Sequence, residues 1–598
     1  MASDDRADKA PFSEQIRSFS GVYWVANWME LVERFAYYGV RVVLPVYMVL
    51  AISEGGPELD HVQKGTIYAL WAVVQSFLPI FTGGFADRYG YKLNIAIATV
   101  LKIIGYLVMG YCVPIAEALD GMPLAEAREL GEDSVYAVFF GGAMLLAGGT
   151  AIFKPGLQGL IANQMPKKSA ALGWGLFYQM VNIGGFLGPL LAGYLRVLDW
   201  SHVFLACTIG ICLNFVPLFF FQEPTRARGA EEDDDESEEG GVLEVIQDAI
   251  YGLLEPRLFF FTMCFAGFWL MFYQLFDILP NFIDDWIDAR AVATDLQGIL
   301  GESAVPVTDE GNMTQEWMIN VNALMISLLA FAFGYLTGFM RSLQAIVIGI
   351  AISAVAIFGL GMSMSGYWIL GAIALFSVGE MLASPTKMRY LAGIAPPGKE
   401  GLYMGYVNMT VGIGWSTGSV IAGDMYQREG DKVELARRYL VEHEGLDAEL
   451  VEEIDRADVI GQLAERLDAG VWEIREILWQ EYEPYRMWMV FTAIGVGSLL
   501  LLVVYDRIVR AAEANPEHSF NTKGNVWVRA GLVPIVLGFA IAFYNSGGDV
   551  AVGFLTTLFG LLFVASFFPR KKRRRGPPDG GDDDEGGEPD REGTPSTF

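Results

Sequence analysis

The stretch YWVANWMELVERFAYYGVRVVLPVYMVL, residues 23–50, is apolar enough to cross a membrane and yet carries four charged side chains. In an α-helix its polar side chains fall on one face, while Trp, Val, Leu and Phe cover the rest. A charge at bilayer depth costs about 2.5–3.5 kcal/mol on insertion scales, so these groups must face a cavity or partner charges. We therefore expect this span to line a polar pathway, as is typical of transporters. The polar face consists of Glu30, Glu33, Arg34, Tyr37, Tyr38 and Arg41.

The whole chain has the composition of an integral membrane protein. Hydrophobic residues make up 53% of its 598 positions, and apolar runs of about 20 residues recur from end to end. The four cysteines and four histidines stand apart, without the spacing of metal ligands, so no metal site is predicted. The sequence has no P-loop and no H-E-x-x-H motif, which argues against an ATP-driven pump and against a membrane hydrolase. We expect no enzymatic activity, no cofactor and no nucleic-acid partner.

The distribution of basic residues predicts the orientation of the chain. Fourteen apolar runs between residues 21 and 568 predict fourteen transmembrane helices. Loops rich in Lys and Arg mark the cytosolic side of a membrane, and the basic residues here fall into loops that share one side. We therefore expect a multi-pass protein of the cell (inner) membrane with both termini in the cytosol. These basic residues are Arg88, Lys92, Lys167, Lys168, Arg226, Arg228, Arg341 and Lys399, followed by the run 570–575.

The charge pattern also divides the chain into segments. An acidic linker with an amphipathic stretch separates six spans from six more, and a charged segment interrupts the second set. Two amphipathic stretches in that segment predict a small helical hairpin, and a docking role for it toward an unknown partner is left open. We expect the last two spans to pack peripherally. The predicted segments are 1–20, a cytosolic tail; 21–221, a six-helix bundle; 222–256, the cytosolic linker; 257–425 with 485–510, a second six-helix bundle; 426–484, an extracytoplasmic insertion; 527–568, two additional spans; and 569–598, a disordered cytosolic tail.

The loop GGFADRYGYK, residues 83–92, resembles the G-x-x-x-D-R-x-G-x-[RK] loop of the major facilitator superfamily. Two six-helix bundles joined by a cytosolic linker are what that architecture requires. The resemblance implies an all-α membrane protein with the major facilitator fold and two extra C-terminal helices. In it, the loop carboxylate pairs with basic residues as the bundles rock. The matching positions are Gly83, Asp87, Arg88, Gly90 and Lys92.

Further motifs narrow the resemblance to the proton-coupled oligopeptide transporter family. ELVERFAYYGVR, residues 30–41, resembles the family's E-x-x-E-R-F-x-Y-Y-G-x-R motif. GTAIFKP (149–155) is similar to its fourth-helix motif, FYQMVNIG (177–184) to its fifth, and GEMLASP (379–385) to its tenth, with a weaker likeness at INVNAL (319–324). The motifs occur in the family's order over residues 21–508, roughly.

The resemblance implies roles for individual residues. Glu33 would carry the coupling proton, assisted by Glu30, and Arg34 and Lys154 would pair with it and attract a peptide carboxylate. Glu380 would attract the peptide ammonium and meet Lys154 in an inner gate. Tyr37 and Tyr38 would form walls of the site, Asn182 and Asn322 would bind the peptide backbone, and Arg41 and Tyr273 would also contact the substrate. The alternatives are a structural ion pair within the first helix, and ordinary interhelix packing for the tyrosines and asparagines.

The chain departs from the family pattern on the seventh helix. The family's glutamate is replaced by Tyr273, and Asp277 follows one helical turn further out. We expect Arg41 and Asp277 to form an outer-gate ion pair, with the Tyr273 hydroxyl donating nearby, because an unpaired guanidinium is costly in a membrane. The alternative is that Asp277 meets water, together with Asp284 and Asp285. The tenth helix also carries Lys387 and Arg389 where the family has small or apolar residues.

These features predict a secondary active transporter. The expected activity is proton-coupled symport of di- and tripeptides, or similar zwitterions, into the cell by alternating access. Its partners are then the substrate, protons and the lipid bilayer, and the proton gradient replaces any cofactor. Two alternatives remain: a carrier for a non-peptide solute (an anion, drug or glycoside), which the loss of the seventh-helix glutamate favours, and a non-transporting receptor or scaffold.

Overall fold

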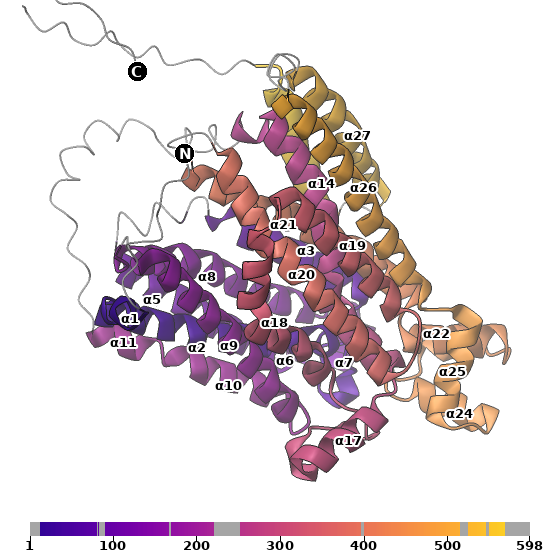
Figure 1. The fold of residues 1–598 in the computed structure, drawn as a ribbon. Helices are drawn as coiled ribbons and strands as arrows, with labels where there is room; N and C mark the ends of the chain where they lie inside the picture. The colour runs from indigo at the N-terminus through magenta and orange to yellow at the C-terminus, as the bar shows by residue number, and fades with distance from the viewer. Residues whose placement is uncertain are drawn as a thin grey trace, which may run out of the picture.

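The computed structural model describes residues 12–79, 82, 90–166, 169–220, 251–395, 400–514, 524–545 and 549–568. In this part of the chain the regular elements are helices, apart from two isolated β-bridges. Ten of the helices are long and apolar enough to cross a membrane. Figure 1 shows the helices of residues 91–212 gathered in one half of the molecule and those of residues 342–429 and 486–514 in the other. The protein is therefore an all-α molecule with two helical bundles.

The first bundle contains α2, whose polar face was described above. Small residues allow α9 to lie directly against it: a Cβ at Gly188 would be 2.3 Å from the Phe35 carbonyl oxygen, and one at Gly184 would be 2.4 Å from that of Leu31. The bundle comprises α1 (Phe12–Arg17), α2 (Gly21–Tyr47), α3 (His61–Phe77), α5 (Tyr91–Gly110), α6 (Cys112–Asp120), α7 (Leu124–Glu129), α8 (Val135–Asn163), α9 (Ala170–Arg196), α10 (Trp200–Cys212) and α11 (Phe215–Phe220).

The second bundle begins with a broken helix. We expected one continuous span over 257–285, but the helix is interrupted at Tyr273 and again at Ile278. Pro280, in the first turn of the following helix, lacks the N–H that a continuous helix needs. The bundle comprises α14 (Pro256–Phe272), α15 (Gln274–Asp277), α16 (Leu279–Trp286), α18 (Gln315–Gly338), α19 (Ser342–Leu360), α20 (Gly366–Ile394), α21 (Glu400–Glu429) and α26 (Arg486–Ala514).

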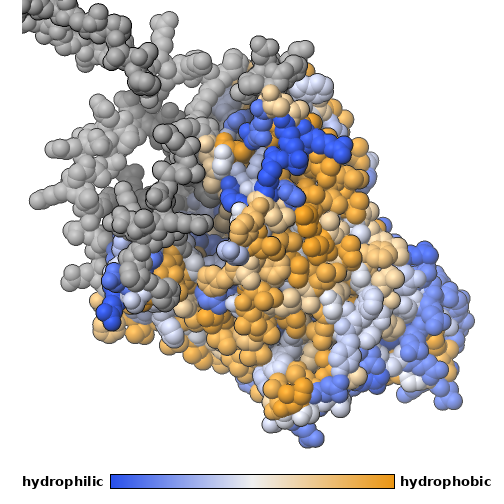
Figure 2. All heavy atoms as spheres, viewed as in Figure 1, coloured by the Kyte–Doolittle hydropathy of each residue, from blue (hydrophilic) through white to orange (hydrophobic). Residues whose placement is uncertain are grey.

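Short helices outside the bundles gather at one end of the molecule, which we call the capped end (Figure 1). They are α17 (Arg290–Leu300), α22 (Lys432–Glu442), α23 (Ala448–Glu452), α24 (Val459–Leu467) and α25 (Val471–Tyr482). Figure 2 shows hydrophilic residues over α22–α25 and a broad apolar flank on the adjoining bundle. The expected hairpin is thus wrong in detail. Four helices, which we call the cap (residues 430–485), pack around fully buried Leu435, Leu463 and Ile474.

Asp431 organises the cap and joins it to the first bundle. Its carboxylate caps α22, forms an ion pair with Arg456 and lies 2.9 Å from His61 Nε2 on α3. Burial alone would raise the pKa of the Asp431 carboxyl, but the Arg456 guanidinium and the hydrogen bond from His61 hold that pKa well below its usual range. The cap is therefore fastened to the first bundle by one buried carboxylate.

The two additional helices lie at the edge of the molecule, as predicted. α27 (Gly524–Asn545) packs on α14, and α28 (Val550–Ala565) packs on α3 and α21. Thr66 Oγ1 on α3 donates to Asp549, at the start of α28, over 2.6 Å. Ten long apolar helices are found among the described residues, so the count of fourteen spans stays a prediction. The helices α2, α3, α21 and α28 are not among the ten: α3 has only 17 residues and α28 only 16, and α2 carries several charges.

Several predicted features lie outside the described residues. These are most of the acidic linker with its amphipathic helix, residues 1–11 of the N-terminal tail, the C-terminal tail, and Gly83, Asp87 and Arg88 of the predicted conformational loop. Of that loop, Gly90 directly precedes α5 with a φ of 96°, a conformation that glycine adopts readily, and Lys92 lies in the first turn of α5.

Candidate functional site

A cavity of about 290 Å³ lies between the two bundles. Helices α2, α8 and α9 form one wall, and α14, α18 and α20 form the other. The aromatic side chains of Trp269, Phe272 and Trp415 supply much of its apolar surface. All nine residues predicted to bind substrate line it: Arg34, Tyr37, Tyr38, Arg41, Lys154, Asn182, Tyr273, Asn322 and Glu380. The sequence motifs thus converge on a single cavity.

A buried ion cluster adjoins the cavity in the first bundle. Glu33, with no exposed surface, forms ion pairs with Arg34 and with Lys102 on α5. Arg34 Nε lies 3.0 Å from Glu30 Oε1, and Lys102 Nζ lies 4.4 Å from the centre of the Phe153 ring. The cluster holds two carboxylates against two cations, so its charges balance by direct contact.

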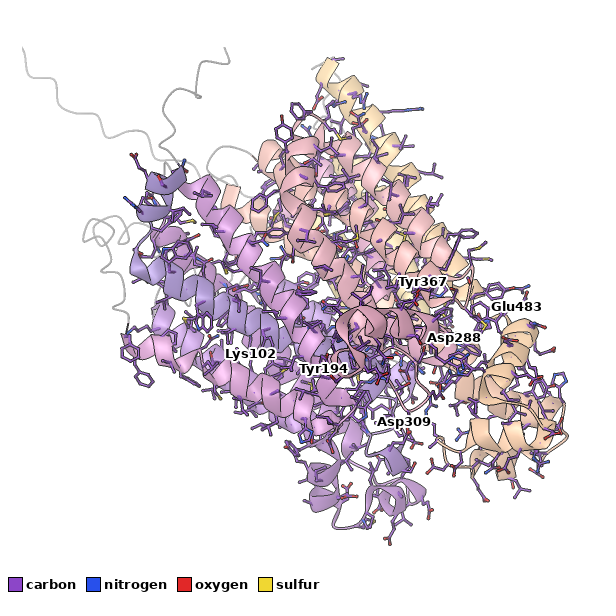
Figure 3. The ribbon with its side chains drawn as sticks, turned by 60° about the horizontal axis from the view of Figure 1, so that its bottom comes forward. Lys102, Tyr194, Asp288, Asp309, Tyr367 and Glu483 are labelled. Carbon is purple, nitrogen blue, oxygen red and sulfur yellow. The ribbon has the colours of Figure 1, made fainter. Side chains whose placement is uncertain are left out.

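The second cation of this cluster differs from the one that the sequence predicted. We expected Lys154 to pair with Glu33, but Lys102 takes that position (Figure 3 labels it in the first bundle). Its signal was present: Lys102 is a lone charge in the middle of the apolar helix YKLNIAIATVLKIIGYLVMG, residues 91–110. A charge at bilayer depth needs a partner or a polar cavity, and this argument, which identified the polar face of α2, applies equally to the lysine of α5.

Lys154 and Glu380 face the cavity from opposite bundles without forming the predicted ion pair. Within the described part of the chain, no carboxylate oxygen lies within 4.0 Å of Lys154 Nζ, and no cation lies that close to Glu380. Glu380 Oε2 instead accepts from Asn322 Nδ2 at 2.9 Å, and Ser377 Oγ lies 3.0 Å from the same amide. The two opposite charges therefore remain available to a ligand.

The predicted contact between Arg41 and Asp277 is present as an ion pair. Arg41 also lies 4.0 Å from the centre of the Tyr68 ring. The second carboxylate oxygen of Asp277 accepts from Trp415 Nε1 at 2.9 Å and from Ser419 Oγ at 2.7 Å. Tyr273, expected to donate here, instead stacks on Trp415 with ring centres 4.3 Å apart. Two residues of α21 thus do what the sequence assigned to Tyr273.

Further contacts between the bundles close the cavity toward the capped end. Lys64 Nζ on α3 donates to Asn281 Oδ1 at 2.7 Å, and Asn281 Nδ2 donates to the Pro45 carbonyl at 2.8 Å. Arg196 on α9 bridges Asp284 at 2.7 Å and Glu316 at 3.0 Å. In Figure 3, where this end comes forward, Tyr194 of α9 lies at the junction of the two bundles. This is the arrangement expected when a transporter is closed on this side.

The acidic residues near Asp277 are not a solvated group. Asp284 is held by Arg196, and Asp285 accepts from the Tyr426 hydroxyl at 2.7 Å and lies 3.5 Å from Lys432. The alternative in which Asp277 merely meets water beside them is therefore wrong. Asp277 is 2% exposed and belongs to the contact between bundles.

Two polar residues of the cavity wall are partly satisfied within their own bundle. Asn182 Nδ2 donates to the Tyr178 carbonyl at 2.8 Å, and the Tyr37 hydroxyl bonds with the Gln75 amide at 3.0 Å.

The chain also contains a G-x-S-x-G pattern, typical of serine hydrolases, at 414–418 within α21. Ser416 there donates to the Gly412 carbonyl at 2.6 Å, so it is no exposed nucleophile. Among the residues that the structure describes, no group of His, Cys, Asp and Glu is arranged to hold a metal.

Comparisons with known proteins agree with this architecture. The sequence profile described as Major Facilitator Superfamily matches residues 27–285 and 300–430. "Peptide transporter YePEPT" of Yersinia enterocolitica is 23% identical over 64% of this chain and 83% of its own length. "Multidrug resistance protein MdtH" of Shigella dysenteriae is 22% identical over 65% of this chain and 83% of its own length.

Solved structures give the same fold. The crystal structure of "peptide transporter POT in complex with sulfate" has a TM-score of 0.53 and 18% identity, covering 82% of this chain and 94% of that one. A POT family transporter in complex with 5-aminolevulinic acid has a TM-score of 0.51 and 16% identity, covering 77% and 96%.

The chain belongs to the Major Facilitator Superfamily. Within it, the motifs on α2, α8, α9 and α20 resemble those of the proton-coupled oligopeptide transporter family, and a peptide transporter is among the similar proteins.

Proposed function

We propose that the protein is a proton-coupled symporter that moves di- and tripeptides, or similar zwitterions, into the cell. The observation that carries this proposal is the cavity between the bundles. Arg34 and Lys154 face it from one bundle and Glu380 faces it from the other. A peptide presents a carboxylate and an ammonium at its two ends, so a site with opposite charges on opposite walls matches it and draws the bundles together.

The ion cluster supplies a route for proton coupling. Glu33 shares Arg34 with the cavity, since Arg34 both contacts Glu33 and lines the substrate space. A substrate carboxylate that draws Arg34 toward itself weakens the hold of Arg34 on Glu33 and favours protonation of that glutamate. Proton and substrate binding are then coupled through one guanidinium, and release of the substrate toward the cytosol frees Arg34 to expel the proton.

The orientation of the molecule follows from the basic loops. With fourteen spans and both termini cytosolic, the cap lies on the extracytoplasmic side of the cell membrane. Arg41 and Asp277 then form the outer gate, which is shut in this conformation. Opening outward requires the pair to separate, and the same rocking movement brings Lys154 toward Glu380 on the inner side. In this proposal the two charged pairs form in alternation.

Uptake into proteoliposomes tests the proposal. The purified protein is reconstituted, and uptake of a labelled dipeptide library is measured with and without an inward proton gradient. We expect concentrative uptake of dipeptides only with the gradient, and its collapse on adding a protonophore. Gradient-independent accumulation, or no dipeptide uptake by a protein that still exchanges another solute, would contradict it.

A carrier for a non-peptide solute is the second candidate. Tyr273 replaces an expected carboxylate in the cavity wall, and the relatives include the drug-resistance protein MdtH at 22% identity. This candidate predicts proton-dependent movement of lipophilic cations or other solutes, with no competition from dipeptides. The same vesicles, loaded with a fluorescent drug, distinguish the two.

A further inference from the structure

Lys387 is a buried cation without a carboxylate partner. It lies on α20, seven residues after Glu380, and is 5% exposed. Its Nζ lies 3.7 Å from the centre of the Trp269 ring, a cavity-lining residue of α14. Throughout the residues that the structure describes, no carboxylate oxygen comes within 4.0 Å of this ammonium. The direct contact that compensates its charge is with the aromatic face of Trp269.

Glu380 does not neutralise Lys387 by direct contact. Seven residues of α-helix separate them by about 10.5 Å along the axis. Glu380 Oε2 accepts a hydrogen bond from the Asn322 amide. The charged groups nearest to Lys387 are Glu380 and Lys154. A second ammonium thus lies near the first, without a contact that cancels either.

The charges around the cavity therefore do not balance for a neutral substrate. Glu30 and Glu33 are matched by Arg34 and Lys102 through direct contacts. Outside this cluster and the Arg41–Asp277 pair, Lys154 and Glu380 line the cavity, and Lys387 lies against the lining residue Trp269, so two ammonium groups are present for one carboxylate. A zwitterionic peptide leaves this excess of positive charge in place, whereas a peptide with one additional carboxylate removes it. In a low-dielectric site such a difference changes affinity strongly.

We propose that Lys387 makes this transporter selective for acidic peptides, whose additional carboxylate it binds at the end of the cavity away from the cap. The inference rests on the proposed function and names its substrate class. Trp269 holds the ammonium beside the cavity while the site is empty. An extended tripeptide, at about 3.3–3.6 Å per residue, spans the distance between Glu380 and Lys387. A dipeptide with a glutamate side chain covers it as well.

The test is competition in proteoliposomes. Uptake of labelled Ala-Ala, a neutral dipeptide, is inhibited by Ala-Glu or by Ala-Gln, which has the same size but no additional charge. We expect the inhibition constant of Ala-Glu to be about tenfold lower, which corresponds to about 1.4 kcal/mol. In Lys387→Gln the two constants should come within about twofold of each other, with that of Ala-Gln unchanged.

Arg389→Gln is the matched control. It removes the same charge from the same helix, but Arg389 is exposed and bonds to the Thr337 and Met340 carbonyls, away from the cavity. This variant should keep the preference for Ala-Glu. If Lys387→Gln fails to fold, the inference is tested by the ratio of the Ala-Gln and Ala-Glu inhibition constants in the unmodified protein and in Lys387→Arg. The Lys387→Arg variant retains the charge and should retain the preference for Ala-Glu.

Each contrary result has a separate meaning. Equal inhibition by Ala-Glu and Ala-Gln in the unmodified protein overturns the inference while leaving peptide transport intact. Equal losses for both peptides in Lys387→Gln also overturn it, because they indicate that Lys387 supports the bundle and does not select the ligand. Absence of Ala-Ala uptake in an active preparation overturns the proposed function, and the inference with it.

Discussion

The two bundles hold buried charge in different ways. In the first, Glu30, Glu33, Arg34 and Lys102 contact one another, so every charge of this cluster has a partner inside the bundle. In the described part of the second, Glu380 and Lys387 lie on one helix without an ion pair, and their contacts are with Asn322 and Trp269. A cluster that is complete by itself suits a task that every transport cycle repeats, such as carrying a proton. Isolated charges suit recognition of a ligand that completes them.

Glu33→Gln gives the largest expected effect and tests the role of the first bundle. The change keeps the size of the side chain but removes the exchangeable charge, so proton-driven uptake should fall to background. Counterflow of substrate, which needs no net proton movement, should remain measurable. The two assays are run on the same proteoliposomes. Undiminished gradient-driven uptake would show that the proton is carried elsewhere.

Lys102→Met should reduce driven uptake by about tenfold or more. The change leaves Glu33 buried with Arg34 as its only close cation, and removal of one partner from a buried ion pair is strongly unfavourable. A double-mutant cycle with Glu33→Gln sharpens the test. The lysine change should add little once the carboxylate is gone, because both substitutions remove the same contact. Independent, additive losses would mean that Lys102 acts outside the cluster.

The contact between the bundles is tested by exchanging Arg41 and Asp277. Either Arg41→Asp or Asp277→Arg should lower uptake by roughly tenfold, since each leaves a like-charge pair or an unpaired charge in the gate. The double exchange should recover part of the activity. Recovery should be incomplete, because Trp415 and Ser419 donate to the carboxylate at position 277 and cannot donate to a guanidinium. A double variant no better than the worse single one would remove this pair from the gate.

The cap offers the smallest expected effect on transport and a clear effect on local stability. Asp431→Asn should leave uptake within about twofold but increase hydrogen exchange of α22 and α24, since Arg456 loses its buried carboxylate. The pKa of Asp431 is depressed by its partners, so its stabilisation is present above pH 4, roughly, and is lost as the pH falls through the folded-state value.

Hydrogen exchange at pH 7 and near pH 3 measures this dependence. The cap of the unmodified protein should lose protection between the two values beyond the intrinsic pH dependence of exchange. The same peptides in Asp431→Asn should show no such additional loss. Equal protection of the two proteins at pH 7 would show that the carboxylate does not fasten the cap.

Much of the cavity was predictable because its residues follow helical periodicity. The polar face of α2 could be identified by its spacing alone, and the resemblance located Lys154, Asn182 and Glu380 on other helices. The cap was harder to predict. Its two longest amphipathic stretches were identified, but α23 and α24 were missed because α23 has only 5 residues and α24 only 9, which is short for a periodic pattern to be recognised.

The sequence by itself determined the class of fold, the division into bundles and the charged face that lines the pathway, since each depends on composition or on spacing within one helix. The tertiary structure decided which charges meet. Lys102, and not Lys154, contacts Glu33 from 69 residues away, and Trp415 and Ser419 take the place expected for Tyr273 beside Asp277. Hydropathy and periodicity place a side chain on a face of its helix. Its partner depends on how far neighbouring helices slide and rotate against each other, which glycines such as Gly184 and Gly188 set by permitting close packing between distant segments.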